Sequence, residues 1–192
     1  MTVWGQNLGP IPHRHVCRWQ IIDHRDEKSV IRWRTESEHH GVQEKGRTEI
    51  FQDCHLRVGE IVSDTTPATN ASVHEQRFDA TESGDAKYAS FTEITPQSAQ
   101  AFGMEPGMIP ARLGLVLSTA GLTGHDIFKS ITAAGKCVLL CSWKGAQAAK
   151  SWTPQSFDGV KEIRHRVVRV VRDYGMFDRR EAPQYFPDVK QS

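Results

Sequence analysis

Trp143, His24 and His125 are of the residue types that enzymes use to bind aromatic molecules and to move protons. Trp143 ends the apolar run "CVLLCSW", where its indole could stack on a ligand or simply pack in a core. His24 is a candidate general base, because an unperturbed imidazole titrates near neutral pH, or else a surface histidine. His125 precedes Asp126 in a strand-like segment, where neighbouring side chains point to opposite faces, so only one of the two can face a site.

Tyr88, Arg57 and Arg166 could bind a polar group of a ligand. Tyr88 begins a strand-like segment and is a candidate hydrogen-bond donor. Arg57 and Arg166 occupy corresponding positions in "HLRVGEIVSD" and "HRVVRVVRDY", and such a pair could anchor an anionic oxygen. The alternative is that both are exposed strand arginines.

The arginine-rich segment "RHRVVRVVRDYGMFDRR" raises the question of nucleic-acid binding. On a strand, Arg166, Val168, Val170 and Arg172 would share one face and Arg169 the other, so neither face is a continuous basic stripe. The 192 residues contain 24 basic and 23 acidic side chains, for a formal net charge of +1. Proteins that bind phosphate backbones carry a clear basic excess. We therefore expect a strand, and no nucleic-acid partner.

The elements that must position these side chains follow the order β-α-β-β-α-β over the second half of the chain. Alternating or apolar runs predict strands at 88–94, 125–131, 136–143 and 165–174, and spacings typical of helices predict helices over 110–121 and from 146 to 152. Pro110 and Gly121 would mark the two ends of the first helix. This order predicts an α+β, ferredoxin-like antiparallel sheet with both helices on one face.

An earlier segment repeats part of this pattern. Residues 17–33 match 137–152 in their order of strand, helix start and tryptophan, and residues 55–64 match 165–174. We therefore predict a partial β-α-β repeat over 1–64, a linker over 65–85, a complete unit over 86–174 and a C-terminal tail over 175–192. The linker is rich in Thr, Ser, Ala and Asp and lacks apolar periodicity.

Compartment and membrane contact can also be judged from the sequence. The first residues lack a basic start followed by an apolar run, and no apolar stretch approaches the roughly 20 residues that cross a bilayer.

Cys137 and Cys141 are four apart, which on a strand places both on one face, and the four cysteines of the chain follow no zinc spacing. We expect buried thiols, no metal, no membrane partner and a cytoplasmic protein.

The segments "EHHGVQEKGRTEIF", "CHLRVGEIV", "GLTGHDIFKSI" and "LLCSWKGAQAAKSW" resemble the antibiotic-biosynthesis-monooxygenase-like (ABM) family of the dimeric α+β barrel superfamily. The resemblance implies two ferredoxin-like sheets facing one another as a barrel, here one complete unit and one partial repeat. The first copy lacks the opening strand and helix of the family pattern. Unpaired sheet edges would result, so we expect a homodimer.

The resemblance also implies three alternative functions. The first is a monooxygenase that oxidises an aromatic or polyketide-like small molecule without a cofactor, using a base, a group that binds the substrate anion and a dry pocket. The second is a haem-binding or haem-degrading protein, in which His39 or His40 would be the axial ligand. The third is a barrel without catalytic activity that binds a small hydrophobic ligand. Fold alone does not separate these functions.

Overall fold

The computed structural model describes residues 2–7, 18–21, 45, 56–66, 85–98, 105–130 and 132–174. The chain forms two compact units, one made of residues 1–21 and 58–172 and the other of 22–57 and 173–192. In the second unit the described residues are the helical, exposed Lys45 and the strand ends at 56–57 and 173–174. The candidate site therefore has to be sought in the first unit.

The described strands form one seven-stranded sheet in the order β2-β1-β5-β6-β4-β7-β3. In chain order they are β1 (Thr2–Asn7), β2 (Arg18–Ile21), β3 (Leu56–Asp64), β4 (Tyr88–Pro96), β5 (Leu122–Ser130), β6 (Cys137–Trp143) and β7 (Val160–Tyr174). The pairings of β1 with β2 and β5, of β4 with β6 and β7, and of β5 with β6 are antiparallel. Within the predicted four-strand unit, β4 lies between β6 and β7.

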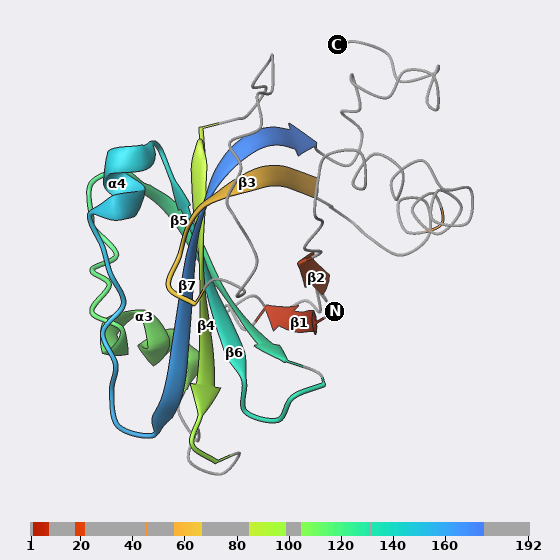
Figure 1. Ribbon diagram of the computed structural model, residues 1–192, viewed down its shortest axis with the longest axis vertical. Helices are drawn as coiled ribbons and strands as arrows, with labels where there is room; N and C mark the ends of the chain where they lie inside the picture. The colour runs from red at the N-terminus through yellow and green to blue at the C-terminus, as the bar shows by residue number, and fades with distance from the viewer. Residues whose placement is uncertain are drawn as a thin grey trace. The chain divides into compact units, whose positions relative to one another are not determined.

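The order of elements from β4 to β7 is compatible with the predicted ferredoxin-like α+β arrangement. Between β4 and β5 lie the 3-10 helix η2 (Pro106–Met108) and α3 (Ile109–Arg112), and α4 (Ala146–Lys150) lies between β6 and β7. The strands of this part stand in the order β5-β6-β4-β7. Both helices lie on the same side of the sheet (Figure 1). The predicted strands of the second half are confirmed, with β7 five residues longer at its start.

The helix predicted over 110–121 is wrong in its extent, because α3 ends at Arg112. Gly114 adopts φ +76°, which places it in the left-handed region. The N–H of Leu115 donates to the carbonyl of Pro110 at 2.8 Å, and that of Gly114 to Ala111 at 3.0 Å. These two bonds form a Schellman motif, the usual way in which a glycine ends a helix. The sequence contained the stop signal at Gly114, not at Gly121.

Gly121 instead makes a close approach to α4, and we expect Gly121→Ala to destabilise the fold by about 1–3 kcal/mol. Its φ is +86°, and a Cβ built on it would lie 2.6 Å from the Cβ of Ala148. Urea unfolding followed by circular dichroism measures the change. Gly107→Ala is the matched control, since a Cβ there meets no atom within 4 Å. Equal stability of the two variants would contradict this packing.

The two faces of the sheet carry separate apolar clusters. The face toward α3 and α4 carries Ile94, Ile109, Leu113, Leu115, Ile127, Cys137, Leu139, Cys141, Trp143, Ala149, Trp152, Val160 and Val167. The opposite face carries Ala89, Phe128, Val138, Leu140 and Val170. Because side chains alternate along a strand, each residue of β4, β6 and β7 is assigned to one of these faces. We call the first the helix face.

The described strands of the first sixty residues belong to this same sheet. β2 and β3 coincide with the predicted opening and closing strands of the partial repeat, and β1 forms a strand that was not predicted. The predicted linker and tail, 65–85 and 175–192, lie almost wholly outside the described residues. The repeat, the barrel and the homodimer stay predictions. Within the described residues, no helix is long and apolar enough to cross a membrane.

Candidate functional site

Three polar side chains are buried in the otherwise apolar helix face. Ser90 and Thr92 of β4 are each 0% exposed, and His165 of β7 is 6% exposed. Buried polar groups need hydrogen-bond partners, because an unpaired one costs about 1–3 kcal/mol. The partners of these three side chains therefore define how the interior of the helix face is organised.

His165 is held by Thr92 and Trp152. Thr92 and His165 are Cα partners in the register of β4 and β7, and Thr92 Oγ1 lies 2.9 Å from His165 Nδ1. The Trp152 ring meets the imidazole edge to face, with centroids 5.3 Å apart and an interplanar angle of 89°. Burial lowers the pKa of His165 from 6.5 to about 4. The imidazole is therefore neutral at pH 7 and has a nitrogen lone pair that can accept a proton.

Trp143 and Ser90 continue this arrangement along the sheet. The Trp143 indole N–H donates to Ser90 Oγ at 2.9 Å. The rings of Trp143 and Trp152 lie 6.3 Å apart at 29°. The Trp152 indole N–H in turn lies 3.4 Å from the carbonyl oxygen of Leu113, just beyond α3. Ser90, Thr92, Trp143, Trp152 and His165 thus form one continuous set between sheet and helices, which we call the aromatic layer.

The backbone of His165 is fixed from the other side by β3 and the residue after it. The N–H of Thr65 donates to the carbonyl of His165 at 3.0 Å, and the N–H of His165 donates to Thr65 Oγ1 at 2.9 Å. Nearby, Arg164 binds Asp64 with Nη2 2.6 Å from Oδ2. Burial acts to raise the pKa of Asp64, but hydrogen bonds from Arg164 and the Thr66 N–H outweigh it and lower the pKa.

Of the residues predicted from sequence, Trp143 and Tyr88 come together. They are Cα partners of β6 and β4, and Tyr88 packs half-buried against the helix-face cluster. Residues directly opposite in an antiparallel pair share a face, so Tyr88 lies beside the aromatic layer. His125 lies on β5 opposite Cys141 but is exposed. It is not among the buried side chains of the layer.

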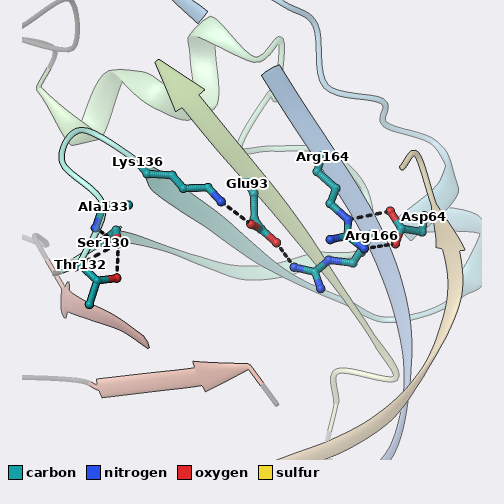
Figure 2. Close-up of polar contacts among 8 residues, drawn as sticks. All are labelled: Asp64, Glu93, Ser130, Thr132, Ala133, Lys136, Arg164 and Arg166. Carbon is teal, nitrogen blue, oxygen red and sulfur yellow. Dashed lines mark hydrogen bonds and ion pairs between the residues drawn. The ribbon is translucent and has the colours of Figure 1, made fainter. Parts of the chain in front are cut away.

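Arg166 lies on the opposite face of the sheet. Its Cα partner is Phe91, and its guanidinium forms an ion pair with Glu93, which also binds Lys136 with Nζ 3.1 Å from Oε2. Figure 2 shows Glu93 between these two cations, and Asp64 facing Arg164. The Arg166 side chain is 7% exposed, so the ion pair is largely shielded from water. Arg166 therefore does not join Trp143 and Tyr88.

The remaining predicted residues are Arg57 and three histidines. Arg57 lies on β3 and is half-buried. His24, His39 and His40 lie outside the described residues. Within the described ranges, no group of three or more His, Cys, Asp or Glu side chains is arranged to hold a metal ion.

The cysteines of β6 behave as predicted from their spacing. Cys137 and Cys141 are buried and unbridged. Burial raises the pKa of both thiols to about 12, so they stay protonated and chemically inert near neutral pH. They serve as small apolar residues of the helix face.

The sequence analysis did not select His165, Thr92 or Ser90. His165 directly precedes Arg166 on the strand, so the two side chains point to opposite faces. The sequence carried no signal that Thr92, more than seventy positions earlier, would stand beside His165 in the register. The hydrogen bond between them follows from strand pairing and could not be derived from local pattern.

Comparison with known proteins gives one clear relationship. No family model matches the chain. The chain is 36% identical over 168 residues to a protein of Pyricularia oryzae named jasmonate monooxygenase ABM. The alignment covers 85% of this chain and 73% of the relative. At this identity and coverage the two chains share ancestry and fold over most of their length.

Proposed function

This chain belongs to the ABM family, and we propose that it is a monooxygenase that oxidises a small, largely apolar molecule without a metal or an organic cofactor. The relative's name supports the monooxygenase activity. The substrate class comes from the apolar character of the helix face. Ligand sites of this kind combine apolar walls, which supply affinity, with a few polar groups that orient the ligand.

The observation that carries this proposal is the environment of His165. It is buried, neutral and oriented by a hydrogen bond to Thr92, and it lies against Trp152. In the tautomer in which Nδ1–H donates to Thr92, Nε2 carries the lone pair. Its lone pair is free at neutral pH, and the negative charge that develops on a deprotonated substrate beside it would stabilise the imidazolium, which burial alone disfavours. The aromatic layer would stack on the substrate and exclude water.

The chemistry needs only the substrate and O2. A CH2 group made acidic by a carbonyl loses a proton to His165, and the resulting carbanion reduces O2 and forms a C–O bond. The hydroperoxide then loses water, for which His165 returns its proton, and a new carbonyl forms. One oxygen atom enters the product and the other leaves as water, so that R2CH2 and O2 give R2CO and H2O. The electrons come from the substrate.

Oxygen consumption by the purified protein tests this function. Anthrone represents an aromatic, polyketide-like substrate, and jasmonic acid is the compound whose name the relative carries. We expect one O2 consumed per product, and mass spectrometry after reaction under 18O2 should find one labelled atom in the product. The activity should persist after dialysis against EDTA and without NADPH. Trp143→Ala should lower it through loss of a wall of the site.

Two outcomes would overturn the proposal. One is the absence of oxygen uptake with every carbonyl-activated substrate tried. The other is uptake that depends on added haem, flavin or metal. To detect a dependence on haem, flavin or metal, the absorption spectrum and the metal content of the purified protein would be measured together with its activity.

A further inference from the structure

Exposed apolar side chains gather around the short helix α3. Within the described residues four large hydrophobic side chains are exposed, and three of them lie on either side of α3 along the chain: Met108 at 50%, Val116 at 63% and Leu117 at 52%. Single exposed apolar side chains are ordinary, but a group of them marks a contact site. The surroundings of this group indicate what it contacts.

Val116 and Leu117 belong to a turn whose shape is fixed by the backbone. The N–H of Thr119 donates to the carbonyl of Val116 at 2.9 Å. This bond closes a β-turn with Leu117 and Ser118 at its two corners. Corner positions favour Gly, Pro, Asn, Asp and Ser, so a leucine there is unusual. Leu115, directly before the turn, is 3% exposed and packs in the helix-face cluster, so the core anchors a turn whose apolar side chains face water.

Backbone contacts bring the segment after this turn beside α4. The N–H of Lys144 donates to the carbonyl of Gly121 at 2.8 Å, and a Cβ built on Gly121 would lie 2.6 Å from the Cβ of Ala148. Figure 1 shows the chain running from α3 toward α4 on the helix side of the sheet. Three exposed cations therefore belong to the same layer: Arg112 of α3, Lys144 before α4 and Lys150 of α4.

The charge of this layer has one sign. Residues 106–125 and 143–157 contain these three basic side chains and no Asp or Glu, whereas the whole chain has 24 basic and 23 acidic side chains. The acidic residues Glu105, Asp126 and Asp158 lie just outside the two ranges. None of the three cations forms an ion pair with a described residue. We call the exposed apolar and basic residues of this layer the outer patch: Met108, Arg112, Val116, Leu117, Lys144 and Lys150.

We propose that the outer patch binds the surface of a membrane that contains anionic lipids, with Val116 and Leu117 inserted among the headgroups. The inference does not depend on the proposed oxygenation. Apolar side chains gain from burial at the headgroup boundary, and each Lys or Arg near an anionic surface strengthens binding about fivefold. Such a contact needs no membrane-spanning helix. The expectation of no membrane partner rested on the lack of a spanning segment, so it does not bear on this contact.

A protein partner fits the composition of the outer patch less well. Protein interfaces are enriched in aromatic side chains and depleted in lysine. The outer patch contains two lysines, and among the described residues none of the exposed large hydrophobic side chains is aromatic. Apolar side chains at a turn, combined with unpaired cations, match the mixed apolar and anionic character of a lipid surface.

Flotation with lipid vesicles tests the inference. The probes are vesicles of phosphatidylcholine alone and of phosphatidylcholine mixed with phosphatidylserine. The full chain should bind the vesicles with phosphatidylserine about tenfold or more tightly than the neutral ones, and added salt should weaken this binding. Leu117→Ser should weaken it about five- to tenfold through lost apolar burial, and Lys144→Gln about fivefold. Val116→Ser is a second, independent variant of the turn.

Val62→Ser is the matched control, because Val62 is an exposed apolar residue of β3, outside the outer patch. It should leave vesicle binding unchanged, and circular dichroism should show the wild-type fold in every variant, since each replaced side chain is exposed. The inference is wrong if the wild type binds neither kind of vesicle or binds both equally, or if Leu117→Ser binds as Val62→Ser does. Lack of vesicle binding together with reduced self-association of Leu117→Ser in analytical ultracentrifugation would assign the outer patch to a second copy of the chain instead.

Discussion

Replacement of His165 by asparagine should reduce the turnover of the oxygenation about 100-fold or more, because general-base catalysis typically contributes 10²- to 10⁴-fold. The Asn amide can still hydrogen-bond Thr92 from near the position of Nδ1, but it has no atom at Nε2. The folded core is therefore retained while the proton acceptor is lost. An oxygen electrode gives kcat and KM for the variant, and circular dichroism checks its fold.

The pH profile distinguishes a base from a packing residue. Wild-type kcat/KM should fall as the pH approaches 4, because protonation of His165 removes the lone pair, and this limb should be absent in His165→Asn. His125→Asn tests the alternative base selected from sequence. If that variant loses activity and His165→Asn does not, the base lies at the exposed end of β5 and the role of the aromatic layer is only structural.

Acid should destabilise the protein through the same histidine. The pKa of His165 is about 4 in the folded state and 6.5 in the unfolded chain, so the unfolded state binds more protons between these values. The free energy of unfolding therefore falls as the pH drops from 6.5 to 4, by about 3 kcal/mol at most. Urea unfolding at several pH values measures this slope in wild type and in His165→Asn.

The difference between the two proteins isolates the contribution of His165. Asp64 acts in the same direction but in a lower window, because its pKa is lowered below 3.8 and its contribution is lost only as the pH falls through that range. His165→Asn should therefore show the shallower slope between pH 6.5 and 4. Parallel curves for the two proteins would mean that His165 titrates normally, and the buried, neutral imidazole would have to be abandoned.

The strands were predictable because their signal is local. Alternation in "RHRVVRVVRDY" separated Arg166 from Arg169, and the structure places these two arginines on opposite faces. Arg166 was selected because the repeat pairs it with Arg57, but a single sequence does not say which face the helices cover, and the register places Arg166 opposite Phe91, on the face away from Tyr88. The family was recognised from short motifs and is confirmed by the relative of 36% identity.

The errors have physical causes that a sequence pattern does not reveal. The apolar spacing through "ARLGLVLSTAG" suits a helix, but the backbone of Gly114 turns left-handed and ends α3 after one turn. His165 was not selected from the sequence, because its partner Thr92 becomes a neighbour only once β4 and β7 pair. The site depends on the pairing register of β4 and β7, which brings together residues far apart in the sequence, and not on local composition.

The two bonds between Thr65 and His165 bear on where a minimal working fragment must begin. A recombinant piece that starts at residue 85 would keep every side chain of the aromatic layer. It would lack Thr65, which forms hydrogen bonds with both the N–H and the carbonyl of His165. Such a piece would present its imidazole from an outer strand without these bonds, so the shortest catalytically competent form has to include Thr65, the first residue of the predicted linker, and β3 directly before it.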